Sequence, residues 1–468
     1  MMGKIGSVAT GLILISSIIL YFIPSTGGIS REVIRASALV VFAMGFWATG
    51  ALPEYLTALI FFLIAMISKV APASVVFSGF HSTALWLVFG GLVLAAAVKR
   101  TGLGQRLAHR LLGFFGTSYV AVISGIVLLG MLVAFIMPST MGRVALLIPV
   151  VVAMAERLGF SEDSPGRNGM VLAATLGCFA PSCAVLPANV PNMVLAGTSE
   201  NLYNLTFSYG NYLKLHYPVV GFMKGITIVI LTCFLFPDRV RSVPSTHHGT
   251  RGSFSPHEWM LMLILSGTLL LWGTDFLHGV SPAWVALAAA VVCMLPFIGL
   301  LPVGAFTQAI NFGPIFYVAG VLGVGAVVAR TGIGNILGRE LLELIGFEPG
   351  RDMRNFFSLV MLSTAVSPVA TGVGVPAILA PLSADIAKAT GFPLVTVLMT
   401  QAIGISNLIL PYQVPPVVVG MQLGGVSITR GVRLTLALAA VSIFILMPIN
   451  YLWWCLLGLF GHAPIASP

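Results

Sequence analysis

The sequence predicts an all-α polytopic membrane protein in which eleven transmembrane helices and two re-entrant hairpins form an inverted 5+5 repeat. Three observations predict this fold: long apolar runs, few charged residues and an internal repetition. Of the 468 residues, 58% are hydrophobic and only 8% are charged, whereas a soluble domain carries about 25% charged residues. Most of the chain therefore belongs in lipid.

Eleven apolar runs are long enough to cross a bilayer, which takes about 20 helical residues. They cover residues 8–24, 34–51, 53–69, 82–99, 168–198, 214–236, 257–275, 281–299, 312–329, 393–421 and 432–459. The segments 118–158 and 354–389 are each too long for one crossing and are interrupted in the middle. We expect both to be re-entrant hairpins, which leave the membrane on the side where they entered.

An altered copy of Met137–Phe160 returns at Thr371–Phe392. The matching positions in the first copy are Ala145, Leu147, Pro149, Gly159 and Phe160. The glycines and the Arg-Thr-Gly motif of residues 90–104 recur at 320–334, and LPANVP from Leu186 recurs as LPYQVP from Leu410. Each half holds five crossings and one hairpin. Because five is odd, the second half is inverted in the membrane relative to the first.

The repeats divide the chain into four parts. We expect an N-terminal helix at 1–33, a first inverted repeat at 34–236, a cytoplasmic linker at 237–256 and a second inverted repeat at 257–468. A cytoplasmic N-terminus places more Lys and Arg in the inner loops than in the outer loops, which is the usual bias. The C-terminus is then external, and the chain lies in the cell (inner) membrane.

The remaining composition excludes several classes of function. The formal charge of +9 comes from Lys and Arg spread through interhelical loops. This distribution indicates how the helices are oriented across the membrane and does not indicate a nucleic-acid-binding surface. The five cysteines have no paired spacing that would indicate a disulfide framework or a zinc site. No catalytic motif is present. We therefore expect no enzyme and no organic cofactor or metal cofactor.

The candidate site lies at four interruptions: the two hairpin tips and the breaks at Ala180–Asn192 and Ser406–Pro416. In lipid, irregular backbone persists only where it is buried in protein or lines a cavity. Freed carbonyls, half-helix N-termini and neutral side chains can together hold a small anion. The predicted substrate-binding residues are Ser139, Thr140, Arg143, Ser367, Thr371, Gly372, Asn192 and Gln413. The alternative is a set of Pro/Gly kinks in which hydroxyls bond their own helices.

Two cations inside apolar segments need an explanation. Arg143 follows Ser139 by four residues, and a charge there is a functional hypothesis by default. It could clamp a carboxylate or oxyanion with two parallel hydrogen bonds, or it could instead reach the aqueous vestibule or cap carbonyls of the hairpin tip. Lys224 lies about one-third into its span, and we expect it to extend towards the membrane surface.

The chain resembles the divalent-anion/sodium symporter family over nearly its whole length. The family's Ser-Asn-Thr hairpin tips correspond to Ser139-Thr140-Met141 and Thr371-Gly372-Val373, each followed by a proline ten residues after its first member. Its broken-helix motifs correspond to 189–192 and 414–417. Neither Ser-Asn-Thr triplet is intact.

The resemblance implies a cation-coupled secondary transporter of a small anion such as a di- or tricarboxylate, another organic acid or a sulfate-like oxyanion. It also implies an elevator mechanism, a homodimer, and Na⁺ or H⁺ as the coupling ion. The cation-binding residues that it implies are Ser139, Thr140, Asn189, Pro191, Thr371, Gly372, Asn407 and Pro415. The alternatives are proton-coupled or exchange transport of a different solute, an anion channel and a membrane enzyme; a cation/proton antiporter is disfavoured by the lack of a clear buried acid.

Overall fold

The computed structural model describes residues 4–24, 30–104, 106, 118–137, 139–240, 253–333, 340 and 343–461, and within them every regular element is helical. Six helical stretches are long and apolar enough to cross a bilayer: Thr83–Thr101, Tyr119–Ile136, Tyr209–Leu235, Gly313–Thr331, Gly372–Thr390 and Ile428–Leu456. Four shorter apolar helices accompany them in the described residues. The count of eleven crossings stays a prediction.

Two long helices of the first part, α2 (Arg31–Thr49) and α5 (Thr83–Thr101), begin at serine caps and end at glycines. The other elements of this part are α1 (Lys4–Phe22), α3 (Glu54–Ile67), α4 (Ala73–Val76) and η1 (Ser78–His81). Ser30 and Ser82 accept hydrogen bonds from the backbone at the starts of α2 and α5, which satisfies N–H groups that a helix start leaves unpaired. Gly50 and Gly102 then adopt the left-handed conformation that ends each helix.

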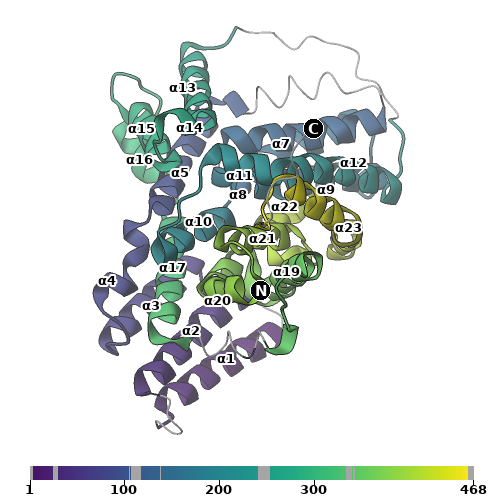
Figure 1. Cartoon of the computed structure of the whole chain (residues 1–468). Coiled ribbons are helices and arrows are strands. Elements are labelled where there is room, and N and C mark those ends of the chain that lie inside the picture. Colours follow the sequence, from purple (N-terminus) through teal and green to yellow (C-terminus); the bar gives the residue numbers. More distant parts are fainter. Residues whose placement is uncertain are drawn as a thin grey trace.

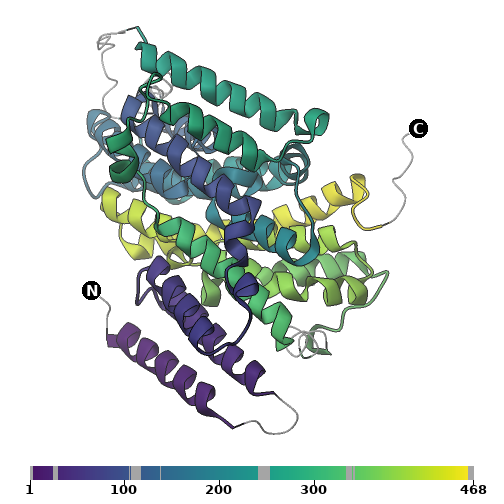
Figure 2. The same cartoon turned by 90° about the vertical axis from the view of Figure 1, so that its left-hand side faces the viewer.

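Of the corresponding helices of the second part, α13 (Pro256–Gly273) lies at the opposite end of the molecule from α1 and α2 (Figures 1 and 2). The others are α14 (Asp275–His278), α15 (Pro282–Met294), α16 (Val303–Ala309) and α17 (Gly313–Thr331). In both orthogonal views, α1 and α2 lie at one end and α13 lies at the other (Figures 1 and 2).

The two parts of the chain interlock through two matching helix pairs. Helix α5 packs on α15, and α17 packs on α3. A Cβ atom added at Gly90 would lie 2.7 Å from the carbonyl carbon of Ala286, and one at Gly320 would lie 2.5 Å from the Cβ of Ala58. These glycines allow the helix backbones to touch, as small residues do between membrane helices. The central packing therefore depends on contacts between the first and second parts.

The first predicted hairpin is a helix pair with an interruption. It consists of α7 (Tyr119–Ile136) and α8 (Thr140–Arg157), separated at Met137–Ser139. The rings of Tyr119 and Phe160, at its two ends, lie 5.9 Å apart. The chain therefore reverses direction at the interruption and returns to where it began.

The second predicted hairpin also reverses, but its backbone stays helical where we expected an irregular tip. It consists of α19 (Asp352–Leu379), η5 (Ala380–Leu382) and α20 (Ser383–Thr390). Nδ2 of Asn355 donates a hydrogen bond to the carbonyl of Thr390 at 3.4 Å, although a straight helix over this length would extend about 50 Å. The chain therefore folds back. Pro368 and Pro376 lie inside α19 and bend it without ending the helical geometry.

Each hairpin is followed by an interrupted helix, as the sequence predicts. The first comprises α9 (Pro165–Phe179), η2 (Pro181–Ala184), η3 (Leu186–Ala188) and α10 (Val190–Tyr203). The second comprises α21 (Leu394–Ser406), η6 (Pro411–Gln413) and α22 (Pro415–Gly424). We call residues 180–189 the first break and residues 407–414 the second break.

The last helix of each part contains a π-helical segment at a corresponding position. The first is α11 (Tyr209–His216), η4 (Tyr217–Met223) and α12 (Lys224–Leu235); the second is α23 (Ile428–Val441), η7 (Ser442–Leu446) and α24 (Met447–Leu456). Single π-turns within α-helices occur often at functional sites. In the first helix the π-segment ends directly before Lys224.

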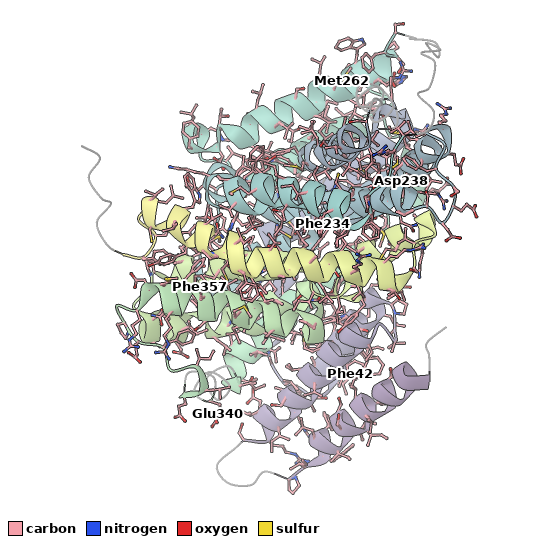
Figure 3. The ribbon with its side chains drawn as sticks, turned by 90° about the vertical axis from the view of Figure 1, so that its right-hand side faces the viewer. Phe42, Phe234, Asp238, Met262, Glu340 and Phe357 are labelled. Carbon is pink, nitrogen blue, oxygen red and sulfur yellow. The ribbon has the colours of Figure 1, made fainter. Side chains whose placement is uncertain are left out.

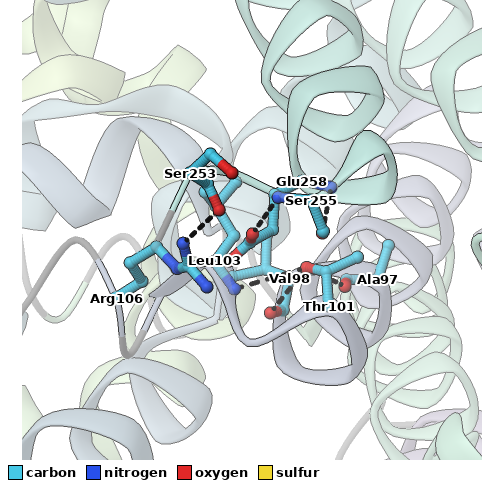
Figure 4. Close-up of polar contacts among 8 residues, drawn as sticks. All are labelled: Ala97, Val98, Thr101, Leu103, Arg106, Ser253, Ser255 and Glu258. Atoms are coloured by element: carbon cyan, nitrogen blue, oxygen red, sulfur yellow. Dashed lines mark hydrogen bonds and ion pairs between the residues drawn. The ribbon is translucent and has the colours of Figure 1, made fainter. Parts of the chain in front are cut away.

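Arg106 attaches the end of the predicted linker and the start of α13 to the first part, while residues 241–252 lie outside the described residues. Nε of Arg106 lies 2.8 Å from Oε1 of Glu258, and its Nη1 donates to the carbonyl of Ser253 at 3.0 Å (Figure 4). Ser255 and Glu258 form a capping box at the start of α13. This contact holds the start of the second part against the segment that follows α5.

Large apolar side chains on the outside of the molecule form a lipid-facing surface. Phe234 on α12, labelled in Figure 3, is 77% exposed, and Phe297 is 81% exposed. Exposed apolar area of this extent is rare on a soluble monomer. It fits the hydrocarbon core of a bilayer.

Gly404 on α21 provides a test of the close packing beside the second break. An added Cβ there would lie 2.9 Å from the carbonyl oxygen of Val360 and 3.0 Å from the amide nitrogen of Thr364. We predict that Gly404→Ala destabilises the protein by about 1–3 kcal/mol through overpacking, measured by thermal unfolding in detergent. Gly267→Ala is the matched control because nothing lies within 4 Å of its added Cβ. Equal melting temperatures for the two variants would contradict the predicted packing.

Candidate functional site

The first break is built from buried amides that bond one another and the backbone. Oδ1 of Asn189 accepts from the amide of Asn192 at 3.0 Å and so caps α10. Nδ2 of Asn192 donates to the carbonyls of Ser182 and Val185 at 3.2 and 2.9 Å. Oδ1 of Asn192 is buried and has no partner in the described residues. This oxygen is therefore a buried hydrogen-bond acceptor that the described residues of the break leave unpaired.

Arg143, fully buried on α8, connects the first hairpin to the first break. Its Nη1 donates to the carbonyls of Met137 and Ala188, the second at 3.0 Å. Its Nη2 donates to Oγ1 of Thr140 at 3.0 Å and to the carbonyl of Cys178 at 2.8 Å. Two acceptors belong to the hairpin and two to the interrupted helix.

These bonds occupy all four N–H groups on Nη1 and Nη2 of Arg143. Only Nε, also buried, has no partner in the described residues. A two-point clamp on an oxyanion would use the N–H groups that already hold protein carbonyls. The geometry therefore matches the capping alternative, in which Arg143 satisfies carbonyls that the interruptions leave free.

The second break is attached to the second hairpin by two amide side chains. Nδ2 of Asn407 donates to Oγ1 of Thr364 at 3.2 Å, and Nε2 of Gln413 donates to Oγ of Ser367 at 2.9 Å. Oε1 of Gln413 accepts from the amides of Ile409 and Leu410. Polar groups of the hairpin and the break thus form one buried network.

Our expectation for Lys224 is wrong. Its side chain does not extend to the membrane surface but is 2% exposed. Its Nζ lies 3.0 Å from the carbonyl oxygen of Ser406, 2.7 Å from Oγ of Ser406 and 3.0 Å from Oδ1 of Asn407. Oxygen acceptors at the second break satisfy the ammonium group in place of water, and only the tertiary structure brings α12 against that break.

The second hairpin bends close to both interrupted helices. A Cβ added at Gly372 would lie 3.4 Å from Cγ2 of Ile405 and 3.8 Å from Cγ of Pro191. Ile405 lies two residues before the second break, and Pro191 lies in the first turn of α10. Gly372 is buried and thus lies close to residues beside both interruptions.

The structure groups the predicted site residues in two sets. Around the first break it places Ser139, Thr140, Arg143, Asn189, Pro191 and Asn192. Around the second it places Ser367, Asn407, Gln413 and Pro415. Pro138 and the side chain of Thr371 lie outside the described residues. The residue that sequence reasoning placed wrongly is Lys224, although a charge within an apolar span was an available signal.

The site combines two buried cations with neutral oxygen and nitrogen atoms. Neither Arg143 nor Lys224 lies within 4.0 Å of a carboxylate among the described residues, and these residues contain no group of three His, Cys, Asp or Glu suited to a metal. At an effective dielectric constant of about 20, two unit charges about 10 Å apart interact by roughly 1.7 kcal/mol. Two buried cations without a nearby carboxylate thus give this region a positive electrostatic potential.

Interrupted helices that surround buried polar groups, within an all-helical apolar bundle, are the architecture of a multi-pass membrane transporter. A family comparison specifies the class further: the model for the sodium:sulfate symporter transmembrane region matches residues 7–460. The chain belongs to this family, which confirms the resemblance to divalent-anion/sodium symporters.

Relatives and a solved structure agree with this family. The chain is 22% identical over 472 residues to an uncharacterized transporter of Haemophilus influenzae, covering 97% of this chain and 99% of the relative. It is 23% identical over 370 residues to the L-tartrate/succinate antiporter of Escherichia coli, covering 72% of each. It matches the structure of the Alcanivorax borkumensis YdaH transporter with a TM-score of 0.54 and 14% identity, covering 96% and 97% of the two chains. The last likeness concerns the fold alone.

The hydrogen bonds of Arg143 predict that its removal lowers the stability of the protein. Arg143→Ala leaves buried carbonyls of two elements without a donor, so we expect a loss of about 3 kcal/mol or more in stability, measured by thermal unfolding in detergent. Arg100→Ala, at an exposed position, is the control and should change stability by less than about 0.5 kcal/mol. A wild-type melting temperature for Arg143→Ala would show that these carbonyls do not need Arg143.

Proposed function

We propose that this protein is a secondary active transporter of a small divalent anion, either a dicarboxylate or a sulfate-like oxyanion. The observation that carries the proposal is the burial of Arg143 and Lys224 at the two breaks without a carboxylate partner. Two fixed positive charges match the charge of a dianion. Membership of the sodium:sulfate symporter family and similarity to an L-tartrate/succinate antiporter support this substrate class.

We place the anion beside Gly372, between the hairpins and the breaks. Ser139, Thr140, Asn192, Ser367, Thr371 and Gln413 are the remaining proposed substrate contacts. Most of the hydroxyl and amide groups described there bond neighbouring protein groups, so we expect backbone N–H groups and the field of the two cations to supply much of the binding. For a coupling ion, we keep as the proposed site the cation-binding residues that the family resemblance implies.

The proposed mechanism is elevator-type alternating access in a homodimer. The matching contacts α5 with α15 and α3 with α17 support two halves related by a pseudo-twofold axis. The recurring π-segments support the same relation. We therefore keep the proposed topology, with re-entrant hairpins, a cytoplasmic N-terminus and an external C-terminus.

Uptake into proteoliposomes tests this function directly. We expect radiolabelled succinate or sulfate to accumulate above its external concentration when a cation gradient or an internal anion drives it, while protein-free liposomes show none. Flux that stops at equal concentrations under every gradient would indicate a channel. No movement of any anion in a panel of di- and tricarboxylates and sulfate would contradict the proposal.

Ser139 provides a prediction on substrate affinity. Its Oγ accepts from the amide of Gly142 at 3.2 Å and caps α8 beside the proposed site. Ser139→Ala removes the cap, at a typical cost of about 1 kcal/mol, so we expect a several-fold higher apparent KM in the uptake assay. Ser139→Gly costs only a few tenths of a kcal/mol as a cap, and it separates capping from direct contact with the anion. An unchanged KM in both variants would place Ser139 outside the site.

A further inference from the structure

Two clusters of neutral oxygen atoms at the breaks each hold a positive charge that belongs to the protein. The first oxygen cluster consists of the carbonyls of Met137, Cys178 and Ala188 with Oγ1 of Thr140, and it holds Arg143. The second oxygen cluster consists of the carbonyl and Oγ of Ser406 with Oδ1 of Asn407, and it holds Lys224.

The hydrogen bonds of the second oxygen cluster match the charged form of Lys224. Oγ of Ser406 donates its own proton to the carbonyl of Ile403 at 2.7 Å, so it accepts from Lys224. Nδ2 of Asn407 donates to Thr364, which leaves Oδ1 facing the ammonium group. All three neighbours of Nζ are therefore acceptors, and only an ammonium group has three N–H donors.

Carbonyl and hydroxyl oxygens at unwound helices are also the ligands that transporters use for Na⁺. In this chain those oxygens face a cation that is covalently attached and cannot dissociate. A mobile cation entering either cluster would compete for the same acceptors and would meet a like charge at short range. Each cluster is thus occupied in this structure by a charge of the protein.

We propose that the ammonium group of Lys224 and the guanidinium group of Arg143 take the place of free alkali cations at the two breaks, so that transport is independent of Na⁺ and operates as anion exchange. This inference rests on the proposed transport of a divalent anion. If the elements that carry Arg143 and Lys224 moved without an anion, they would take two uncompensated charges through a region of low dielectric constant, which is costly. A bound anion offsets these charges during both the inward and the outward movement. The transporter therefore changes conformation most readily with an anion bound.

The first test compares transport by the wild-type protein in sodium chloride and in choline chloride of equal ionic strength. We expect uptake of radiolabelled succinate or sulfate to agree within about two-fold in the two salts, and to be at least about ten-fold faster into liposomes loaded with unlabelled anion than into empty ones, a ratio typical of coupled ligands. Stimulation by Na⁺ of about ten-fold or more would overturn the inference. Absence of transport in both salts would instead contradict the proposed function.

A second test does not depend on transport, and it distinguishes failure of this inference from failure of the proposed function. The melting temperature of the purified full chain in detergent should be the same in sodium chloride and choline chloride, because no vacant cluster binds Na⁺. Stabilisation of the wild-type protein by Na⁺ but not by choline would overturn the inference whatever the transport result.

Lys224→Ala tests the role of the tethered charge. It leaves the second oxygen cluster without a cation, so we expect loss of exchange in choline chloride together with a Na⁺-specific rise in melting temperature. Lys214→Ala is the matched control, since Lys214 lies on the preceding helix α11 and is exposed; it should behave as wild type. Exchange at the wild-type rate by Lys224→Ala in choline chloride would show that the tethered charge is not required.

Discussion

The hydrogen bonds between two buried cations and the carbonyls of two interrupted helices are the interaction on which this structure depends. A break in a membrane helix leaves carbonyl groups without donors, and lipid provides no water to replace them. A buried Arg or Lys has the opposite need, because its N–H groups require acceptors. Arg143 and Lys224 satisfy both requirements at once, which lets irregular backbone persist deep in an apolar protein.

This arrangement also sets the electrostatic character of the site. Buried charges in proteins are usually paired with an opposite charge, but both cations here are held by neutral oxygens among the described residues. Neutral ligands stabilise a cation without cancelling its field. The field that remains favours negative charge near the two cations.

The packing is close both between the two halves and around the site. Helices α5 and α15, and likewise α3 and α17, contact each other through glycine and alanine at backbone distance, and such contacts tolerate little change in shape. The second hairpin packs as closely on α21 at Gly404, and side-chain hydrogen bonds such as that between Gln413 and Ser367 join it to the second break.

The sequence by itself determined the helical membrane class, the two interruptions after the hairpins and most residues around them. Hydrophobicity, proline and repeated motifs are local or periodic properties, and the membrane adds a strong constraint on backbone pairing. The sequence did not determine that helical geometry continues through the second hairpin, because prolines can bend a helix as well as end it. It also did not determine the partners of Lys224 and Arg143. Those partners come from distant segments, such as Ser406 against α12 and Ala188 against α8, and only tertiary packing decides which acceptors a long side chain reaches.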